Sequence, residues 1–280
     1  MSGTKLVLLG TAGGPMPKVT RSAPAHAVVV GASTYLVDCG NGVGRQLALA
    51  GIPFRSLRAA FITHHHSDHN ADYGNLFLLS WTGGLDRPVD VYGPPPLIAM
   101  TEHVLELNAY DIRTRIADEG RPPLAPLIRP HEIYRGGEIY RDDRVAVRCA
   151  VVSHPPVEPA FAFRFDTADR SIVFSGDTTP CANLIELARG ADVLVHEVLY
   201  EPALDDICGH LANATRLRRH LLDSHTTQDQ VGAVAREAGV KTLVLSHFVP
   251  ADPIPAHVWH AAAAAHFDGE IVVGRDLLEL

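Results

Sequence analysis

His64, His66, Asp68 and His69 lie within six residues of one another, a concentration of metal-binding side chains that an ordinary turn does not contain. Neutral imidazole and carboxylate groups are the usual nitrogen and oxygen ligands of zinc and similar divalent metals. The segment follows the apolar run Ala59–Thr63, which is typical of a buried strand. In an extended chain His64 and His66 face the same way, and a turn into a helix would let Asp68 and His69 face a neighbouring metal. A surface histidine run with accidental metal affinity is the alternative, and the presence of Asp68 at a strand end counts against it.

Three further candidate ligands occur downstream, each just after a run of residues typical of a strand: His154, Asp177 and His247. Taken alone, each would be interpreted as an ordinary structural residue. Because α/β folds place their functional sites at the carboxyl ends of strands, the shared position favours a single site.

Strand-like and helix-like segments alternate along the chain, which predicts an α/β fold in one domain over residues 1–280. Gly10–Gly14 is expected to form a turn beside the site, because it lacks the spacing of a phosphate-binding loop. Thr227 and Gln230 fit a capping box that begins a helix. The expected strands are Lys5–Leu9, Ala25–Val30, Thr34–Asp38, Ala59–Thr63, Val145–Ser153, Phe161–Phe165, Ser171–Ser175, Asp192–His196, Lys241–Ser246 and Glu270–Val273. The expected helices are Val43–Ala50, Leu97–Ala117, Cys181–Arg189, Leu211–Leu222, Thr227–Glu237 and Ala256–Phe267.

Composition restricts the setting in which this site works. The net charge of the 280 residues is −8, which counts against a nucleic-acid partner, and Arg216, Arg218 and Arg219 are expected to form a solvated helix face. The four cysteines contain no CxxC pair and are expected to be reduced thiols. No apolar run approaches the ~18 residues of a membrane span, and the N-terminus lacks a signal-peptide pattern. The sequence therefore predicts a cytoplasmic protein without a membrane partner.

The order His64-x-His66-x-Asp68-His69, His154, Asp177 and His247, with intervals of 85, 23 and 70 residues, resembles the metal-site motifs of the metallo-β-lactamase-fold hydrolases. The resemblance implies a four-layer αββα sandwich and two divalent metal ions, with Zn²⁺ expected and Mn²⁺ or Fe²⁺ as alternatives. By the family pattern, His64, His66 and His154 hold one metal. Asp68, His69 and His247 hold the other, and Asp177 bridges the two.

Within this superfamily the chain is most similar to the ribonuclease Z and arylsulfatase-like branch. In ribonuclease Z a long flexible arm that grips tRNA lies between the third and fourth motifs. Here only 22 residues separate His154 from Asp177, and two predicted strands occupy most of them. The arm is therefore expected to be missing, a second argument against nucleic acid. The segments that carry the resemblance are Leu8–Pro15, Asp38–Gly40, Ser175–Pro180, His196–Glu197, Ser224–Thr227 and Ser246–Phe248.

These features predict a two-metal-dependent hydrolase that attacks a small ester-type substrate with a hydroxide bridging the metals. The candidate bonds are phosphodiester, aryl sulfate, carboxylic ester or lactone. A ribonuclease Z-type endonuclease that processes RNA 3′ ends and a non-catalytic metal- or ligand-binding protein on the same fold are the alternatives. A homodimer is the default oligomeric state.

Two residues are assigned catalytic roles. Asp68 is expected both to bind metal and to orient the nucleophile. By the resemblance, His225 donates a proton to the leaving group, with a residue of a helix-capping loop as its alternative. His196 and Glu197 are expected to orient a metal ligand or to line the substrate pocket, unless both are simply packed.

His65 is expected to face solvent or to support the ligands from behind, and the remaining histidines, His220 among them, are interpreted as structural. For His26 and His210 a place in the substrate pocket is the less favoured alternative.

Overall fold

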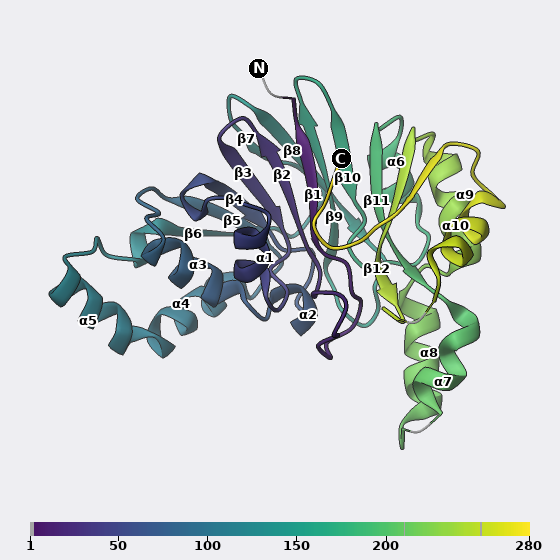
Figure 1. Cartoon of the computed structure of the whole chain (residues 1–280), viewed down its shortest axis with the longest axis horizontal. Coiled ribbons are helices and arrows are strands. Elements are labelled where there is room, and N and C mark those ends of the chain that lie inside the picture. The colour runs from purple at the N-terminus through teal and green to yellow at the C-terminus, as the bar shows by residue number, and fades with distance from the viewer. Residues whose placement is uncertain (1–2, 210, 253) are drawn as a thin grey trace.

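Two β-sheets form the centre of the molecule, shown as a computed structural model in Figure 1. The structure describes residues 3–209, 211–252 and 254–280. In spatial order, the first sheet contains β14 (Leu278–Glu279), β1 (Lys5–Gly10), β2 (Ala25–Val30), β3 (Ser33–Val37), β4 (Leu57–Phe61), β5 (Val89–Gly93) and β6 (Ile128–Glu132). The second contains β13 (Glu270–Val273), β12 (Thr242–Val249), β11 (Val193–Leu199), β10 (Ser171–Phe174), β9 (Ala160–Thr167), β8 (Val145–Val152) and β7 (Gly137–Arg141).

Successive side chains of β9 pack alternately into two apolar cores. Phe161, Phe163 and Phe165 enter the core between the two sheets, where they pack with Phe61 and other apolar residues. Ala160 and Ala162 face the opposite way, into the layer of helices that covers the second sheet. Because successive side chains of a strand point to opposite faces, a strand between two apolar layers is apolar at almost every position.

Helices cover the outer face of each sheet and complete four layers (Figure 1). Helices α1, α3 and α4 contribute to the apolar layer outside the first sheet, and α6, α9 and α10 to the layer outside the second. The predicted αββα sandwich is therefore confirmed. The α-helices are α1 (Val43–Leu49), α2 (Ser67–Asn70), α3 (Tyr73–Thr82), α4 (Leu97–Leu107), α5 (Ala109–Glu119), α6 (Ala182–Ala188), α7 (Leu204–Cys208), α8 (Ala214–Ser224), α9 (Gln228–Ala238) and α10 (Ala256–Ala264). Short 3₁₀ helices span Phe54–Ser56, Ala125–Leu127 and Glu201–Ala203.

Several predicted boundaries differ from the structure. The expected helix Leu97–Ala117 is two helices, because Asn108 ends α4 and its side chain amide donates to the Val104 carbonyl at 2.8 Å. Asparagine competes with helical hydrogen bonding in this way and favours helix ends. The strands expected to end at His196 and Ser246 continue as β11 and β12, so Glu197 and His247 lie within strands.

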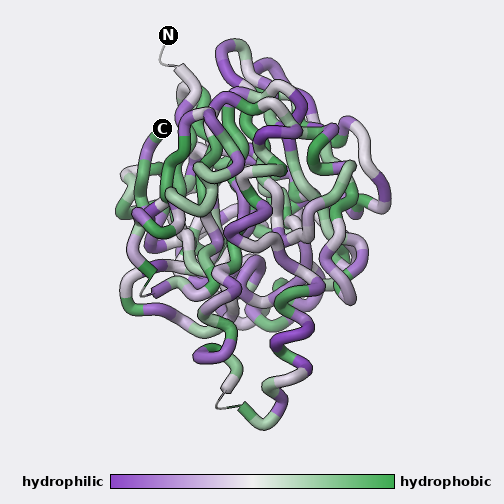
Figure 2. Tube along the Cα trace, turned by 90° about the vertical axis from the view of Figure 1, so that its right-hand side faces the viewer, coloured by the Kyte–Doolittle hydropathy of each residue, from purple (hydrophilic) through white to green (hydrophobic). Residues whose placement is uncertain are grey.

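The ends of several strands meet on one side of the molecule and position the candidate site. β4, β8 and β10 end shortly before His64, His154 and Asp177 respectively. Helices α7 and α8 project from the molecule at the same end as α2 (Figures 1 and 2). Only the strands β9 and β10 lie between His154 and Asp177, as predicted, so no long arm is inserted there. Among the helices described, none is both long enough and apolar enough to cross a membrane.

Candidate metal centre

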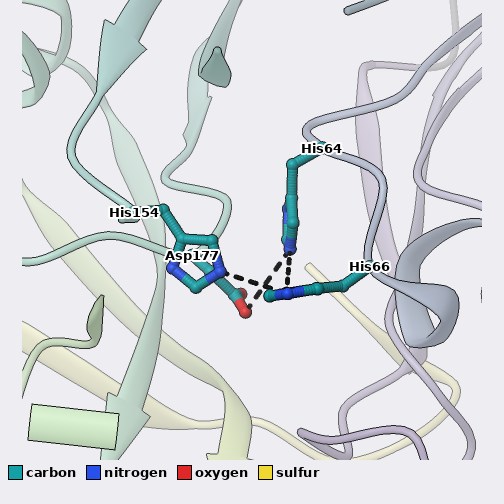
Figure 3. Close-up of side chains that lie close together, drawn as sticks. All are labelled: His64, His66, His154 and Asp177. Atoms are coloured by element: carbon teal, nitrogen blue, oxygen red, sulfur yellow. Dashed lines mark hydrogen bonds and ion pairs between the residues drawn. The ribbon is translucent and has the colours of Figure 1, made fainter. Parts of the chain in front are cut away.

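His64, His66 and His154 bring three ring nitrogens together (Figure 3). Nδ1 of His66 lies 3.1 Å from Nε2 of His64 and 3.1 Å from Nε2 of His154. These separations are close to the roughly 3.3 Å expected between tetrahedral ligands that each lie ~2.0–2.1 Å from zinc. The two segments come from different sheets, because His64 and His66 follow β4 and His154 follows β8.

A second group contains Asp68, His69 and His247. The Nε2 atoms of His69 and His247 are 3.2 Å apart, and Oδ2 of Asp68 is 3.4 Å from Nε2 of His247. The chain turns into α2 directly after His66, so Asp68 and His69 point to a different position from His64 and His66. His247 joins them from β12, where its backbone φ is 46°.

Asp177 lies between the two groups. Its Oδ1 is 3.3 Å from Nε2 of His69 and 3.3 Å from Nε2 of His247, and its Oδ2 is 3.8 Å from Nε2 of His64. Each carboxylate oxygen therefore faces one of the groups. The fold brings all seven predicted ligands together, with Asp177 within 3.8 Å of His64 on one side and within 3.3 Å of His69 and His247 on the other. Glu197 and His225 adjoin them, because they form a further group with Asp177 and His247.

The chemistry of these side chains fits divalent cations. The buried Oδ1 of Asp177 has no hydrogen bond of good geometry among the described residues, although it faces two imidazoles. Burial, and then the neighbouring His154, lower the pKa of His66 to about 4, so this imidazole is neutral near pH 7. Burial opposes the charge of His69 and His247, but Asp177 and other carboxylates raise the pKa of both, so these imidazoles release a proton when a cation binds. Imidazoles and carboxylates form a donor set that zinc, manganese and iron all accept, so the set does not identify the ion.

Residues behind the clusters hold the ligands in place. Nδ1 of His69 donates to Oδ2 of Asp38 at 2.8 Å, and Nδ1 of His154 donates to the Ser224 carbonyl at 2.8 Å. The backbone N–H of Gly14 donates to Oδ2 of Asp68 at 3.0 Å, which places the Gly10–Gly14 turn beside the site as expected. Such bonds fix which nitrogen of an imidazole faces a metal. Asp38 was not among the predicted site residues, although its position at the end of a predicted strand was a usable signal.

Glu197 and His225 form a buried pair at the edge of the clusters. Nδ1 of His225 donates to the Glu197 carboxylate at 2.9 Å and lies 3.9 Å from Oδ2 of Asp177. Burial alone would lower the pKa of His225, but the charge and hydrogen bond of Glu197, and then Asp177, raise it to about 9. His225 is therefore protonated on both ring nitrogens, and positively charged, near pH 7. Glu197 also accepts from the Thr178 N–H at 2.9 Å, which fixes its carboxylate.

His196 is placed differently from Glu197. Its Nδ1 donates to the Glu197 carbonyl at 2.8 Å, and its side chain is fully buried outside both ligand clusters. It lines a cavity of about 20 Å³ together with His26, whose ring stacks on Phe174. His210 lies outside the described residues.

The open cleft at the clusters is bounded by α8, which lies within the segment 198–226 that was expected to help form the substrate pocket. A cavity of about 270 Å³ is lined by Pro15, Val249 and the metal-cluster residues on one side and by α8 on the other. Leu217, His220 and Leu221 are the α8 residues that line it. The spacing of Leu217 and Leu221 on one helix face, with His220 beside them, was the available signal.

The chain matches a known family of proteins over most of its length. Residues 33–248 match the family described as the beta-lactamase superfamily domain. The chain is 38% identical over 277 residues to a protein named Ribonuclease Z from Mycobacterium bovis (strain BCG / Pasteur 1173P2), covering 98% of this chain and 96% of that protein. The chain belongs to the ribonuclease Z family of the beta-lactamase superfamily.

Solved structures support the same fold at lower identity. The metallo-beta-lactamase fold protein YhfI from Bacillus subtilis superposes with a TM-score of 0.73 at 19% identity, covering 99% of this chain and 98% of that one. The short form of human tRNase Z superposes with a TM-score of 0.71 at 20% identity, with the same coverage of both chains.

Membership of the ribonuclease Z family makes the protein a metal-dependent hydrolase that acts on ester bonds, as predicted. The arylsulfatase-like part of the resemblance finds no support among these relatives.

The expectation that nucleic acid is not a partner is wrong, because relatives that match 98% of the chain are named for ribonuclease activity. The physical error was to use the net charge, which averages over the whole surface, as a measure of one groove. A groove of about 250 Å³ that includes Asp68 is also lined by Lys18, Arg21 and Arg45.

Proposed function

We propose that this protein is a ribonuclease Z-type endonuclease that hydrolyses a phosphodiester bond in RNA. The observation that supports this most strongly is the similarity, over nearly the full length of both chains, to proteins named Ribonuclease Z. The two clusters joined by Asp177 supply a suitable site, because phosphodiester hydrolysis is a typical reaction of paired metal ions.

The roles of the protein's own groups follow from their positions. Divalent cations held by the two clusters would make a nucleophilic water available near neutral pH and polarise the phosphoryl oxygen. The carboxylates of Asp177 and Asp68 would place negative charge beside those cations. Asp68 is itself oriented by the Gly14 N–H. His225, whose Nδ1 donates to Glu197, would donate the proton on its Nε2 to the leaving oxygen. Glu197 keeps His225 protonated and correctly oriented.

The groove beside Asp68 offers a path for the RNA backbone. Lys18 and Arg45 are exposed there, and neither forms an ion pair with any residue that the structure describes. Cationic side chains that lack a protein carboxylate are available to phosphates, which dominate the affinity of proteins for nucleic acids.

The test is cleavage of a precursor tRNA transcript that carries a 3′ trailer, with zinc- or manganese-loaded protein. We expect a single cut near the 3′ end in wild type and in the exposed-surface control His103→Ala, and at least a 100-fold lower rate in Asp177→Ala. Hydrolysis of bis(p-nitrophenyl) phosphate by a metal-loaded enzyme that leaves every RNA intact would contradict the proposal.

A small organic phosphodiester is the second candidate substrate. Two observations favour it: the hairpin of β9 and β10 in place of a long arm, and the small cleft of about 270 Å³ at the clusters. The same experiment separates the two candidates, since only the first requires RNA to be cut.

A further inference from the structure

His220 lies at the centre of the cleft without belonging to either metal cluster. The centroid of its ring is 6.2 Å from that of His66, 6.3 Å from that of His154 and 6.2 Å from that of His225. The side chain is half-buried and lines the cleft from α8. A substrate at the clusters would therefore lie against this imidazole.

The hydrogen bonds around Ser224 determine which nitrogen of His220 carries a proton. The Ser224 hydroxyl donates its only hydrogen to the Pro155 carbonyl, since a carbonyl can only accept. Its contact of 3.2 Å with Nδ1 of His220 must therefore run the other way, with Nδ1 as the donor. Within the described part of the chain, no residue forms a hydrogen bond with Nε2 of His220.

The neutral form of this imidazole has an accepting Nε2. With Nδ1–H already engaged by Ser224, the lone pair of Nε2 is the group available to a substrate. A phosphate oxygen is itself an acceptor and does not complement it, whereas a hydroxyl group does.

The position beside His225 identifies which hydroxyl this is. His225 is the residue proposed to protonate the leaving oxygen, and where that oxygen is the 3′ oxygen of a ribose, a hydroxyl lies on the adjacent carbon of the same ring. We propose that Nε2 of His220 accepts a hydrogen bond from the 2′-hydroxyl of the ribose whose 3′ oxygen leaves, so that the site selects RNA over DNA. This inference rests on the proposed function and adds the residue that recognises the ribose. The 2′-hydroxyl is the feature by which proteins distinguish the two nucleic acids.

The experiment is a double-mutant cycle between the protein and the substrate. Wild type and His220→Phe are compared on an RNA transcript and on the same transcript with one 2′-deoxyribose immediately 5′ of the cut. We expect the deoxy substitution to slow wild type by about 3- to 10-fold, the range for one hydrogen bond. His220→Phe should lose a similar factor on the all-ribose RNA and show no further loss on the deoxy substrate. Effects of two changes that remove the same contact do not multiply.

Two further variants exclude a purely structural effect. His220→Asn retains an acceptor on its amide and should recover part of the discrimination between the two substrates, whereas His260→Phe on the exposed face of α10 should discriminate as wild type does. Zinc content and unfolding temperature show whether His220→Phe is folded and loaded, and if it is not, His220→Leu, which also lacks an acceptor, takes its place in the cycle.

The outcomes separate the inference from the proposed function. If wild type cuts no RNA, the proposed function is wrong and the inference is lost with it. If wild type cuts RNA but the deoxy substitution has no effect, or its effect multiplies with that of His220→Phe, the inference alone is wrong.

Discussion

At the scale of single residues, two ligand histidines of the candidate metal centre, His69 and His154, use both ring nitrogens. His69 and His154 each direct Nε2 into a cluster while Nδ1 donates to Asp38 or to the Ser224 carbonyl. An imidazole held in this way is already in the tautomer and orientation that a metal needs. Removal of one ligand should therefore affect one metal, and removal of the shared Asp177 should affect both.

We expect His154→Ala and His247→Ala each to retain about one zinc per chain after dialysis, where wild type retains two. Asp177→Ala should retain less than one, because its carboxylate faces both clusters. Metal content measured by inductively coupled plasma mass spectrometry provides the count. The exposed His103→Ala is the matched control, and loss of both metals in His154→Ala would show that the clusters do not bind independently.

A second prediction concerns the proton on His225. With a pKa of about 9, His225 is protonated at neutral pH, and the rate should fall as the pH rises through that value. Glu197→Gln removes the carboxylate that raises the pKa, so the falling limb should move from about 9 toward or below the ordinary 6.5. Rates of cleavage of the precursor tRNA transcript between pH 6 and 10 test this, because an alkoxide leaving group of ribose needs a proton, whereas p-nitrophenolate does not. A limb that stays in place in Glu197→Gln would show that His225 is not the acid.

At the scale of elements, α9 anchors the segment that carries His225. Thr227 caps this helix in the predicted capping box, with the Gln230 side chain accepting from the Thr227 N–H at 3.1 Å. Thr226 is tied in as well, because its hydroxyl donates to the Thr178 carbonyl at 2.6 Å. The start of the helix therefore fixes both the local backbone and the neighbouring proton donor.

Thr227→Ala should lower the free energy of unfolding by about 1 kcal/mol, because one cap hydrogen bond is lost. Urea denaturation measures the difference. Thr114→Ala, at an exposed position inside α5, should change it by less than ~0.5 kcal/mol, since alanine is the better helix former there. Equal losses in the two variants would contradict the importance of the cap.

At the scale of the whole molecule, the distribution of charge matters more than its sum. The chain carries a net charge of −8, yet the groove beside Asp68 exposes Lys18 and Arg45. A local cationic groove can attract phosphates even on an acidic protein, because the potential depends on nearby charges.

Replacing both Lys18 and Arg45 with Gln should weaken RNA binding and lower the slope of log Kd against log salt concentration by about two. Fluorescence anisotropy with labelled RNA in the presence of EDTA measures binding without cleavage. A protein with Arg113 and Arg236 replaced by Gln is the matched control, because both are exposed and neither lines the groove. An unchanged slope in the groove variant would place the RNA elsewhere.

Local patterns in the sequence predicted the α/β class, the capping box and the candidate ligands, whereas the four-layer sandwich and the division of the ligands between two metals were implied by the family resemblance. His64, His66, Asp68 and His69 are close in sequence, and apolar runs and cap residues depend on neighbours a few positions away. Such features are encoded by short-range geometry, so they can be predicted without knowledge of the packing.

Only the tertiary structure decided which distant groups meet. The Glu197–His225 pair, the contact of Asp38 with His69 and the place of His220 in the cleft join residues from separate elements. The net charge wrongly counted against a nucleic-acid partner for the same reason, because it does not say where the charges lie on the surface. Sequence fixes the kinds of side chain and their local order, whereas burial, pKa and hydrogen-bond partners depend on distances that arise only when the two sheets pack together.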